Sequence, residues 1–256
     1  MNAARKLIPV GVSNRHFHIA PKDVEILFGR GYQLQRLRDI SQRGQYACHE
    51  TLDVVGPKGT IKGIRIVGPP RGQTQLEIAR SDAYRLGIDP PVRYSGDLKG
   101  SAGVKIIGPA GELELKEGVI IAQRHIHMDP RTASEFGVHD RERVFVAPVQ
   151  RDPIQPGCEP RTVIFGNVLI RVDESFVLDF HIDIDEANAS GLKTGDYVYI
   201  VGKEAPVQTV AQKKLITEND VRRAILQHRK IVVPAGVKIT PAAQELAKAH
   251  DIFVES

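Results

Sequence analysis

The 256-residue sequence has no tryptophan and only two cysteines, and aromatic residues make up 5% of it. Cys48 and Cys158 form neither a CxxC pair nor a disulfide framework, which is typical of proteins from a reducing compartment. No apolar run approaches the roughly 20 residues that cross a bilayer. The net charge is only +4, without the basic run of nucleic-acid-binding segments. We therefore expect a cytoplasmic protein without membrane or nucleic-acid partners.

The composition is that of a globular protein rich in turns. Hydrophobic residues make up 41% and charged residues 26% of the chain, and it has 23 glycines and 16 prolines. The apolar runs between these turn residues are short, which favours small β-rich units over long helices. Neither a phosphate-binding P-loop nor a dinucleotide glycine motif is present.

One histidine motif occurs twice in the chain. Residues 14–18 read Asn-Arg-His-Phe-His and residues 123–127 read Gln-Arg-His-Ile-His, and each is followed three residues later by proline and then by a Phe-Gly pair. On an extended chain, residues i and i+2 share one face, so each motif directs two imidazoles toward one point. The repeat therefore predicts a duplicated fold that holds two metal ions.

Other patterns set the expected organisation. Two similar Gly-Pro-x-Gly turns, at residues 56–59 and 108–111, predict hairpins. Proline at the first helical turn predicts helices over residues 21–28 and 130–136, and a third helix is expected at 185–189. We predict a mainly β fold of two small barrels related by internal duplication, with short helices and a C-terminal αβαβ appendix. The expected domains are residues 5–100, 101–205 and 215–256, with an exposed loop at 150–160.

Each histidine pair needs a third ligand, because catalytic zinc has three protein ligands and an open position. His181 alternates with apolar neighbours and is the candidate for the pair His125 and His127. For His16 and His18 a carboxylate is expected, but spacing alone does not decide which one. Imidazole suits zinc and other first-row divalent ions.

Arg71 and Glu77 belong to a second notable segment, residues 69–80. Arg71 lies in a glycine-containing turn, where a guanidinium can bind phosphate with two hydrogen bonds. The alternatives are a solvated loop arginine and an exposed strand glutamate. A nucleophilic cysteine has little support, because Cys48 and the adjacent His49 face opposite sides of a strand.

Five blocks occur in order: residues 9–18, 73–77, 95–101, 124–128 and 181–188. Together they closely resemble the PduL-type phosphotransacylases (phosphate propanoyltransferases) of bacterial microcompartments, over about residues 8–201. The resemblance implies two barrels with two zinc ions between them. It implies that His16, His18 and Glu77 hold one zinc, and that His125, His127 and His181 hold the other. Arg71 would bind phosphate, and Ser13, Arg65 and Asn188 would line the coenzyme A pocket.

The reaction implied is the interconversion of a short-chain acyl-CoA and phosphate with acyl phosphate and coenzyme A. The resemblance also implies a location in the bacterial cytoplasm, inside or beside a microcompartment. Residues 215–256 resemble C-terminal segments of other microcompartment enzymes, which predicts contact with shell or core proteins; a packing or oligomerisation module is the alternative. A homo-oligomer is expected. The rival functions are a two-zinc thioester or phosphoester hydrolase and a non-catalytic metal-binding scaffold. Propanoyl and acetyl substrates differ by one methylene, which the sequence does not resolve.

Overall fold

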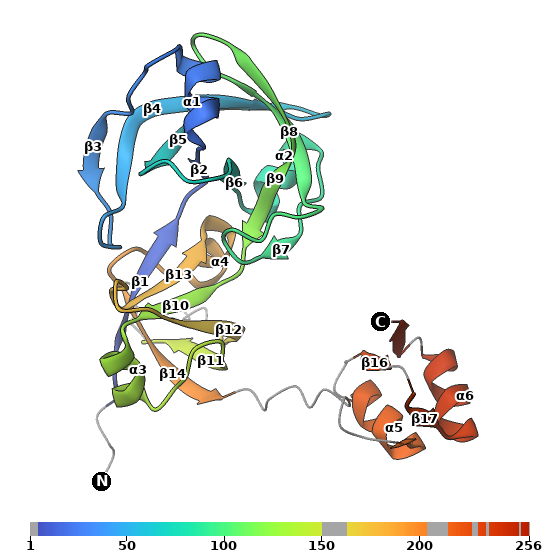
Figure 1. The fold of residues 1–256 in the computed structure, drawn as a ribbon. Coiled ribbons are helices and arrows are strands. Elements are labelled where there is room, and N and C mark those ends of the chain that lie inside the picture. The colour runs from blue at the N-terminus through green and yellow to red at the C-terminus, as the bar shows by residue number, and fades with distance from the viewer. Residues whose placement is uncertain are drawn as a thin grey trace, which may run out of the picture. The chain divides into compact units, whose positions relative to one another are not determined.

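The computed structural model describes residues 5–149, 163–203, 215–226, 230–233, 236–250 and 252–255. The chain divides into two compact units, Met1–Glu204 and Ala205–Ser256. In the described part of the larger unit, the strands close into two six-stranded barrels with mixed strand directions, accompanied by short helices (Figure 1). The predicted fold class is confirmed.

The strands of the first barrel follow the order β4-β5-β2-β6-β9-β8, and the pairing of β8 with β4 closes it. Two short edge strands, β3 and β7, pair with β4 and β9. Its strands are β2 (His16–His18), β3 (Arg36–Asp39), β4 (Tyr46–Val55), β5 (Thr60–Gly68), β6 (Gln75–Glu77), β7 (Val92–Arg93), β8 (Ala102–Ile107) and β9 (Glu112–Ala122).

The second barrel closes in the order β1-β13-β10-β12-β11-β14. Its strands are β1 (Ile8–Ser13), β10 (His125–Met128), β11 (Arg143–Pro148), β12 (Phe165–Val172), β13 (Asp179–Asp183) and β14 (Tyr197–Lys203). Both barrels repeat one pairing scheme. β2 is parallel to β5 and antiparallel to β6, just as β10 is parallel to β12 and antiparallel to β13. The histidine repeat thus relates one barrel to the other.

The strand pairing differs from the predicted division of the chain near residue 100. β1 belongs to the second barrel, where it pairs with β13 and β14, whereas β8 and β9 complete the first. Alternation of apolar residues shows that a segment is a strand but does not identify its partner. The predicted loop at 150–160, with Cys158, lies outside the described residues.

The residue between the two histidines of each motif anchors its barrel. Phe17 and Ile126 are fully buried and belong to the two separate apolar cores. Because successive strand residues point to opposite faces, the flanking histidines point away from their own core. Burial of the middle residue therefore fixes the direction of both imidazoles.

Helices follow the ligand-bearing strands. α1 (Pro21–Phe28) and α3 (Pro130–Phe136) begin with proline in the first turn, as the sequence predicts, and α4 (Ile184–Ser190) covers the third expected helix. Helix α2 (Arg80–Leu86) was not predicted from the sequence. This helix follows Ala79, whose side chain cannot accept a hydrogen bond, so it lacks the usual start signal.

Both Gly-Pro-x-Gly turns are hairpins, as expected, but they lie in the same barrel. The β4–β5 turn packs on the end of α2, where Lys58 N–H donates to the Leu86 carbonyl at 3.0 Å. The β8–β9 turn packs on α1, where Ala110 N–H donates to the Leu27 carbonyl at 3.0 Å. This second repeat relates the two halves of the first barrel.

The smaller unit has its own apolar core, formed by residues such as Ile216 and Val221. β15 (Leu215–Ile216) pairs with β17 (Lys238–Ile239), and β16 (Ile231–Val233) pairs with β18 (Phe253–Glu255), all in parallel. α5 (Glu218–Leu226) and α6 (Pro241–Ala249) pack together. The expected αβαβ order gains the short strands β15 and β17. No described helix has the length and apolar character to span a membrane.

Candidate metal centres

The first group of candidate ligands comprises His16 and His18 on β2 and Glu77 on β6. The Nε2 atoms of the two histidines lie 3.2 Å apart. Glu77 Oε2 is 3.7 Å from His16 Nε2, and Glu77 Oε1 is 4.0 Å from His18 Nε2. Glu77 reaches the pair because it lies directly opposite His16 in the antiparallel β2–β6 ladder.

The backbone orients both imidazoles of this group. His16 Nδ1 is 2.8 Å from the Asn14 carbonyl oxygen, and His18 Nδ1 is 3.3 Å from the Val67 carbonyl oxygen. A carbonyl only accepts, so each Nδ1 carries the proton and each Nε2 keeps a lone pair. The two lone pairs then meet near Glu77, as a metal ion requires.

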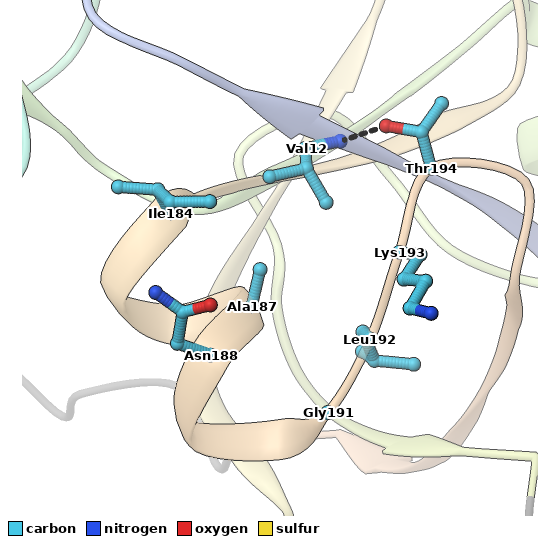
Figure 2. A pocket seen from close by; sticks show the side chains of 8 residues that line it. All are labelled: Val12, Ile184, Ala187, Asn188, Gly191, Leu192, Lys193 and Thr194. Carbon is cyan, nitrogen blue, oxygen red and sulfur yellow. Dashed lines mark hydrogen bonds between the residues drawn. The ribbon is translucent and has the colours of Figure 1, made fainter.

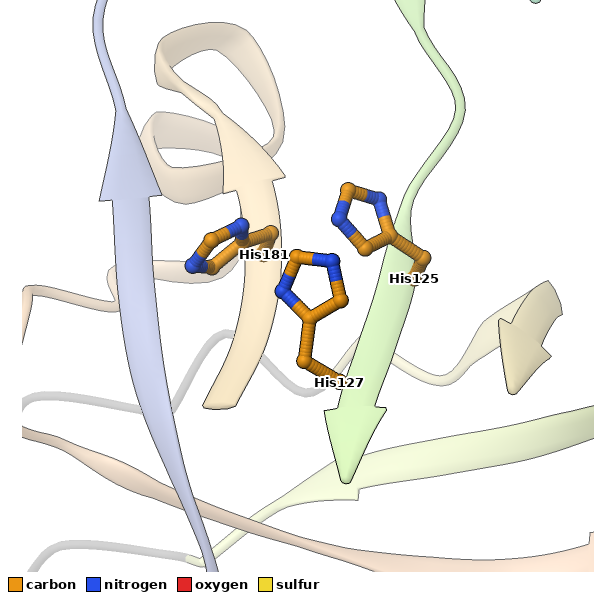
Figure 3. Close-up of side chains that lie close together, drawn as sticks. All are labelled: His125, His127 and His181. Atoms are coloured by element: carbon orange, nitrogen blue, oxygen red, sulfur yellow. The ribbon is translucent and has the colours of Figure 1, made fainter. Parts of the chain in front are cut away.

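The second group comprises His125 and His127 on β10 and His181 on β13 (Figure 3). Their ring centroids are 4.5 Å apart for His125 and His127, 5.2 Å for His125 and His181, and 4.9 Å for His127 and His181. His181 lies opposite His125 in the β10–β13 ladder, just as Glu77 lies opposite His16. The duplicated register therefore supplies the third member of both groups.

Burial keeps His18, His125 and His127 neutral. It lowers the pKa of His18 to about 2, with further contributions from His16 and Arg71. Burial and the nearby His181 lower the pKa of His125 to about 3, and burial, His125 and His181 lower that of His127 to about 2. Neutral imidazole is the form that binds metal ions.

Both groups fit a metal ion. Nδ1 of His127 is buried and has no hydrogen-bond partner, although a buried polar atom without a partner costs about 1–3 kcal/mol. In each group the candidate ligand atoms lie within 4.8 Å of one another. Two imidazoles with a carboxylate, or three imidazoles, suit zinc and other first-row divalent ions.

Two arginines, one from each barrel, adjoin these groups. Arg71 donates to Ser95 Oγ at 3.2 Å and to Gln45 Oε1 at 3.4 Å. Burial lowers the pKa of both Arg71 and Arg171, and the Glu77 carboxylate opposes this effect on both. A single carboxylate thus acts on arginines of both barrels, which places the two groups around a shared region. In Figure 1, β2 and β6 lie on the side of the first barrel that faces β10 and β13.

Arg171 was not among the site residues predicted from the sequence. It lies on β12 opposite His127, and its charge also lowers the pKa of His127 and Arg71. Its guanidinium carbon is 5.4 Å from the centre of the Phe176 ring. No sequence motif surrounds Arg171, so only the pairing of β10 with β12 could have identified it.

Gln75 is a second residue beside the candidate ligands that was not predicted from the sequence to be functional. It is buried, its Nε2 donates to Glu77 Oε1 at 2.5 Å and to Ser95 Oγ at 3.0 Å, and its Oε1 accepts from Gly96 N–H at 2.6 Å. These contacts hold the Glu77 carboxylate in place. They also connect it to the 95–101 block and so to the partner of Arg71.

A pocket of about 290 Å³ opens between β1 and the end of α4 (Figure 2). Its lining includes Val12, Asn188 and Lys193. Of the three residues expected at the coenzyme A pocket, only Asn188 lines it. Ser13 lies next to Val12, with its Oγ 3.4 Å from His16 Nδ1. Arg65 lies on β5 opposite His16 and donates to the Cys48 carbonyl at 2.6 Å.

The chain is similar to known proteins over its larger unit. The sequence model of the phosphate propanoyltransferase family (PTAC) matches residues 9–193. The phosphate propanoyltransferase of Thermotoga maritima is 54% identical over 194 residues, which cover 76% of this chain and 89% of that protein. That of Salmonella typhimurium is 47% identical over 184 residues, 72% of this chain and 83% of the relative. That of Clostridioides difficile is 44% identical over 196 residues, 77% of this chain and 90% of the relative.

Proposed function

The chain belongs to the phosphate propanoyltransferase family of acyltransferases, and on that premise we propose that it exchanges coenzyme A and phosphate on a short acyl group. The substrates are propanoyl- or acetyl-CoA and phosphate, and the products are the acyl phosphate and coenzyme A. The observation that carries the proposal is the pair of three-residue groups with Arg71 and Arg171 beside them. This arrangement combines metal sites with positive charge suited to an oxyanion.

Two zinc ions are the proposed cofactors, one held by His16, His18 and Glu77 and the other by His125, His127 and His181. When bound, zinc supplies Lewis acidity toward developing oxyanions and a favourable partner for a thiolate. Each group offers three protein ligands, which leaves a coordination position for a substrate. Other divalent ions with the same ligand preference are alternatives.

The arginines have a separate role. Arg71 is proposed to bind phosphate with its planar guanidinium, and Arg171 adds a second positive charge from the other barrel. Their half-buried positions exclude much of the water that would otherwise screen these charges. Holding phosphate beside the thioester supplies much of the rate enhancement by proximity.

A direct attack of phosphate on the thioester carbonyl fits the described residues better than an acyl-enzyme. Cys48 is fully buried, and burial, with a smaller contribution from Glu50, raises the pKa of its thiol to about 11. A thiol in that state is a poor nucleophile at neutral pH. The new bond therefore forms between a phosphate oxygen and the acyl carbon as the carbon–sulfur bond breaks.

Coenzyme A is proposed to lie along the pocket between β1 and α4, with contacts to Asn188 and Ser13. Arg65, whose guanidinium now donates to backbone carbonyls, is proposed to contact the same molecule. The apolar side chains of Val12 and Leu192 in the pocket suit the pantetheine arm, which is uncharged.

The setting of the enzyme is also a proposal. We place it in the bacterial cytoplasm as a homo-oligomer associated with a microcompartment, with residues 215–256 contacting shell or core proteins. In the smaller unit, the apolar side chains of Leu226 and Val232 are 82% and 53% exposed, so contact with a partner protein would bury them. Loss of co-sedimentation with microcompartments on deletion of this unit tests the proposal; unchanged co-sedimentation contradicts it.

Metal content and activity test the assignment of ligands. Glu77→Ala and His125→Ala are each expected to lose about one zinc per chain together with most acyl transfer. His139→Ala is the matched control, because His139 is exposed and lies in neither group. Full activity in a thoroughly metal-free wild-type preparation contradicts the two-metal site.

A further inference from the structure

A buried carboxylate, Asp179, contacts one candidate ligand of the second group. It lies on β13 two residues before His181, so the two side chains share one face of the strand. Its Oδ2 is 2.9 Å from His181 Nε2, and Asp179 is only 4% exposed. A buried carboxylate needs hydrogen-bond partners to offset its lost hydration, and His181 is such a partner for Asp179.

The contact determines which ring nitrogen can bind a metal. The Asp179 carboxylate oxygen accepts the hydrogen bond at this distance, so Nε2 of His181 carries the proton and Nδ1 keeps the lone pair. His16 and His125 have the opposite arrangement. Their Nδ1 atoms lie 2.8 Å and 2.7 Å from the carbonyl oxygens of Asn14 and Gln123.

Gly11 on the neighbouring strand β1 leaves room for the pair. It lies opposite His181 in the parallel β1–β13 ladder. A Cβ at this position would lie 2.8 Å from Asp179 Oδ2 and 2.8 Å from His181 Cδ2, closer than real Cβ contacts. Since φ of Gly11 is not positive, the requirement for glycine is steric, and the pair fills the space that a side chain would take.

The first barrel has an equivalent arrangement in which the hydrogen-bond donor and acceptor roles are exchanged. Gln75 lies opposite His18 as Asp179 lies opposite His127, and each is two residues before the third ligand. There the amide of Gln75 donates to Glu77 Oε1 at 2.5 Å. A carboxylate ligand is thus held by a donor, and an imidazole ligand by an acceptor. Such matching at equivalent positions indicates a common role of orienting the third ligand.

We propose that Asp179 is the positioning residue of the second metal centre: it holds the proton of His181 on Nε2 and so makes Nδ1 the metal-binding atom. This inference rests on the proposed two-metal function. Partners of this kind fix the orientation of a ligating histidine, and their loss typically weakens metal binding about 10- to 100-fold.

The first test uses the tautomer of His181 in metal-free wild-type protein. Long-range ¹H–¹⁵N correlation of ¹⁵N-histidine-labelled protein is expected to show His181 protonated on Nε2, with assignment by a His181→Gln variant. Protonation on Nδ1 overturns the proposal. The result does not require a metal, so it remains informative even if the chain binds none and the proposed function fails.

The second test uses zinc itself. Competition with a chromophoric chelator is expected to show the second zinc of Asp179→Asn binding about 10- to 100-fold more weakly, with the first unchanged. Asp173→Asn is the control, because Asp173 bonds to Ser175 in an exposed turn. In zinc-loaded wild type, the ¹³C shift of His181 Cδ2 should report coordination through Nδ1. The proposal is overturned if Asp179→Asn binds the second zinc as tightly as wild type does. It is also overturned if His181 coordinates zinc through Nε2.

Discussion

Replacing Glu186 by glutamine should change how the stability of the protein depends on pH. Glu186 lies in the first turn of α4, with its side chain 21% exposed and Oε1 3.0 Å from Arg124 Nε. Its Oε2 accepts from Asp183 N–H at 3.1 Å. Burial raises the pKa of Glu186 to about 7 despite the opposing charge of Arg124, and the Asp183 carboxylate adds to the effect.

The magnitude follows from the difference between the folded and unfolded states. A rise of the pKa from 4.5 to about 7 corresponds to roughly 3 kcal/mol, at about 1.4 kcal/mol per pH unit. The folded chain holds the proton more tightly, so this contribution is fully present below pH 4.5. It is lost as the pH rises through 7. Glutamine does not titrate and keeps an acceptor for Asp183 N–H. The contribution of residue 186 to the free energy of unfolding should therefore not fall with rising pH in Glu186→Gln.

Equilibrium urea unfolding from pH 4.5 to 8 measures the difference. The free energy of unfolding of Glu186→Gln relative to wild type should increase with pH over this window, and most other titrations cancel in the comparison. Glu135→Gln is the control, since Glu135 pairs with Arg131 on an exposed helix surface, where ion pairs contribute about 0–1 kcal/mol. Parallel pH curves for Glu186→Gln and wild type would refute the reasoning.

Three further predictions concern phosphate, the core and acid. Arg71→Lys should raise KM for phosphate about tenfold or more with little change in KM for acyl-CoA, because lysine cannot replace the planar guanidinium; equal changes in both constants contradict this role. Phe17→Ala should lower the free energy of unfolding by about 3–5 kcal/mol in urea, since Phe17 is fully buried; a loss below about 1 kcal/mol contradicts it. The free energy of unfolding of the metal-free protein should fall by about 1.4 kcal/mol per pH unit for each of His18, His125 and His127 as the pH is lowered below 6.5. The reason is that their lowered pKa values leave these side chains neutral in the folded state and protonated in the unfolded state. A free energy of unfolding that does not change from pH 6.5 to 4 contradicts this prediction.

Local signals in the sequence predicted many of the strands and helices that carry the candidate site. The two His-x-His motifs identified the strands β2 and β10, because alternation and the following proline are readable within a few residues. The starts of α1 and α3 followed from Pro21 and Pro130 for the same reason. His181 was found by alternation with its apolar neighbours. These features depend on neighbours in the chain, not on distant pairing.

Features that depend on strand pairing were not predictable from spacing. Glu77 joins the first group because of its register with His16, and the family resemblance named it where spacing left several carboxylates open. One signal was available: Glu77 and His181 each lie three residues before a helix begins, as do His18 and His127. Using this signal for Glu77 requires a prediction of α2, and α2 lacks the start signal that marks α1 and α3. The membership of β1 in the second barrel was also not predictable, because it depends on pairing with the distant strands β13 and β14.

Coenzyme A release under three anion conditions tests the central proposal most directly. Metal-analysed protein is incubated with propanoyl-CoA or acetyl-CoA and with phosphate, arsenate or neither, while free thiol and acyl phosphate are measured. The account predicts thiol release only with phosphate or arsenate, and one acyl phosphate per thiol with phosphate. Equal thiol release without either anion indicates a hydrolase, and no release from protein loaded with two metal ions indicates a non-catalytic scaffold; either result contradicts the account.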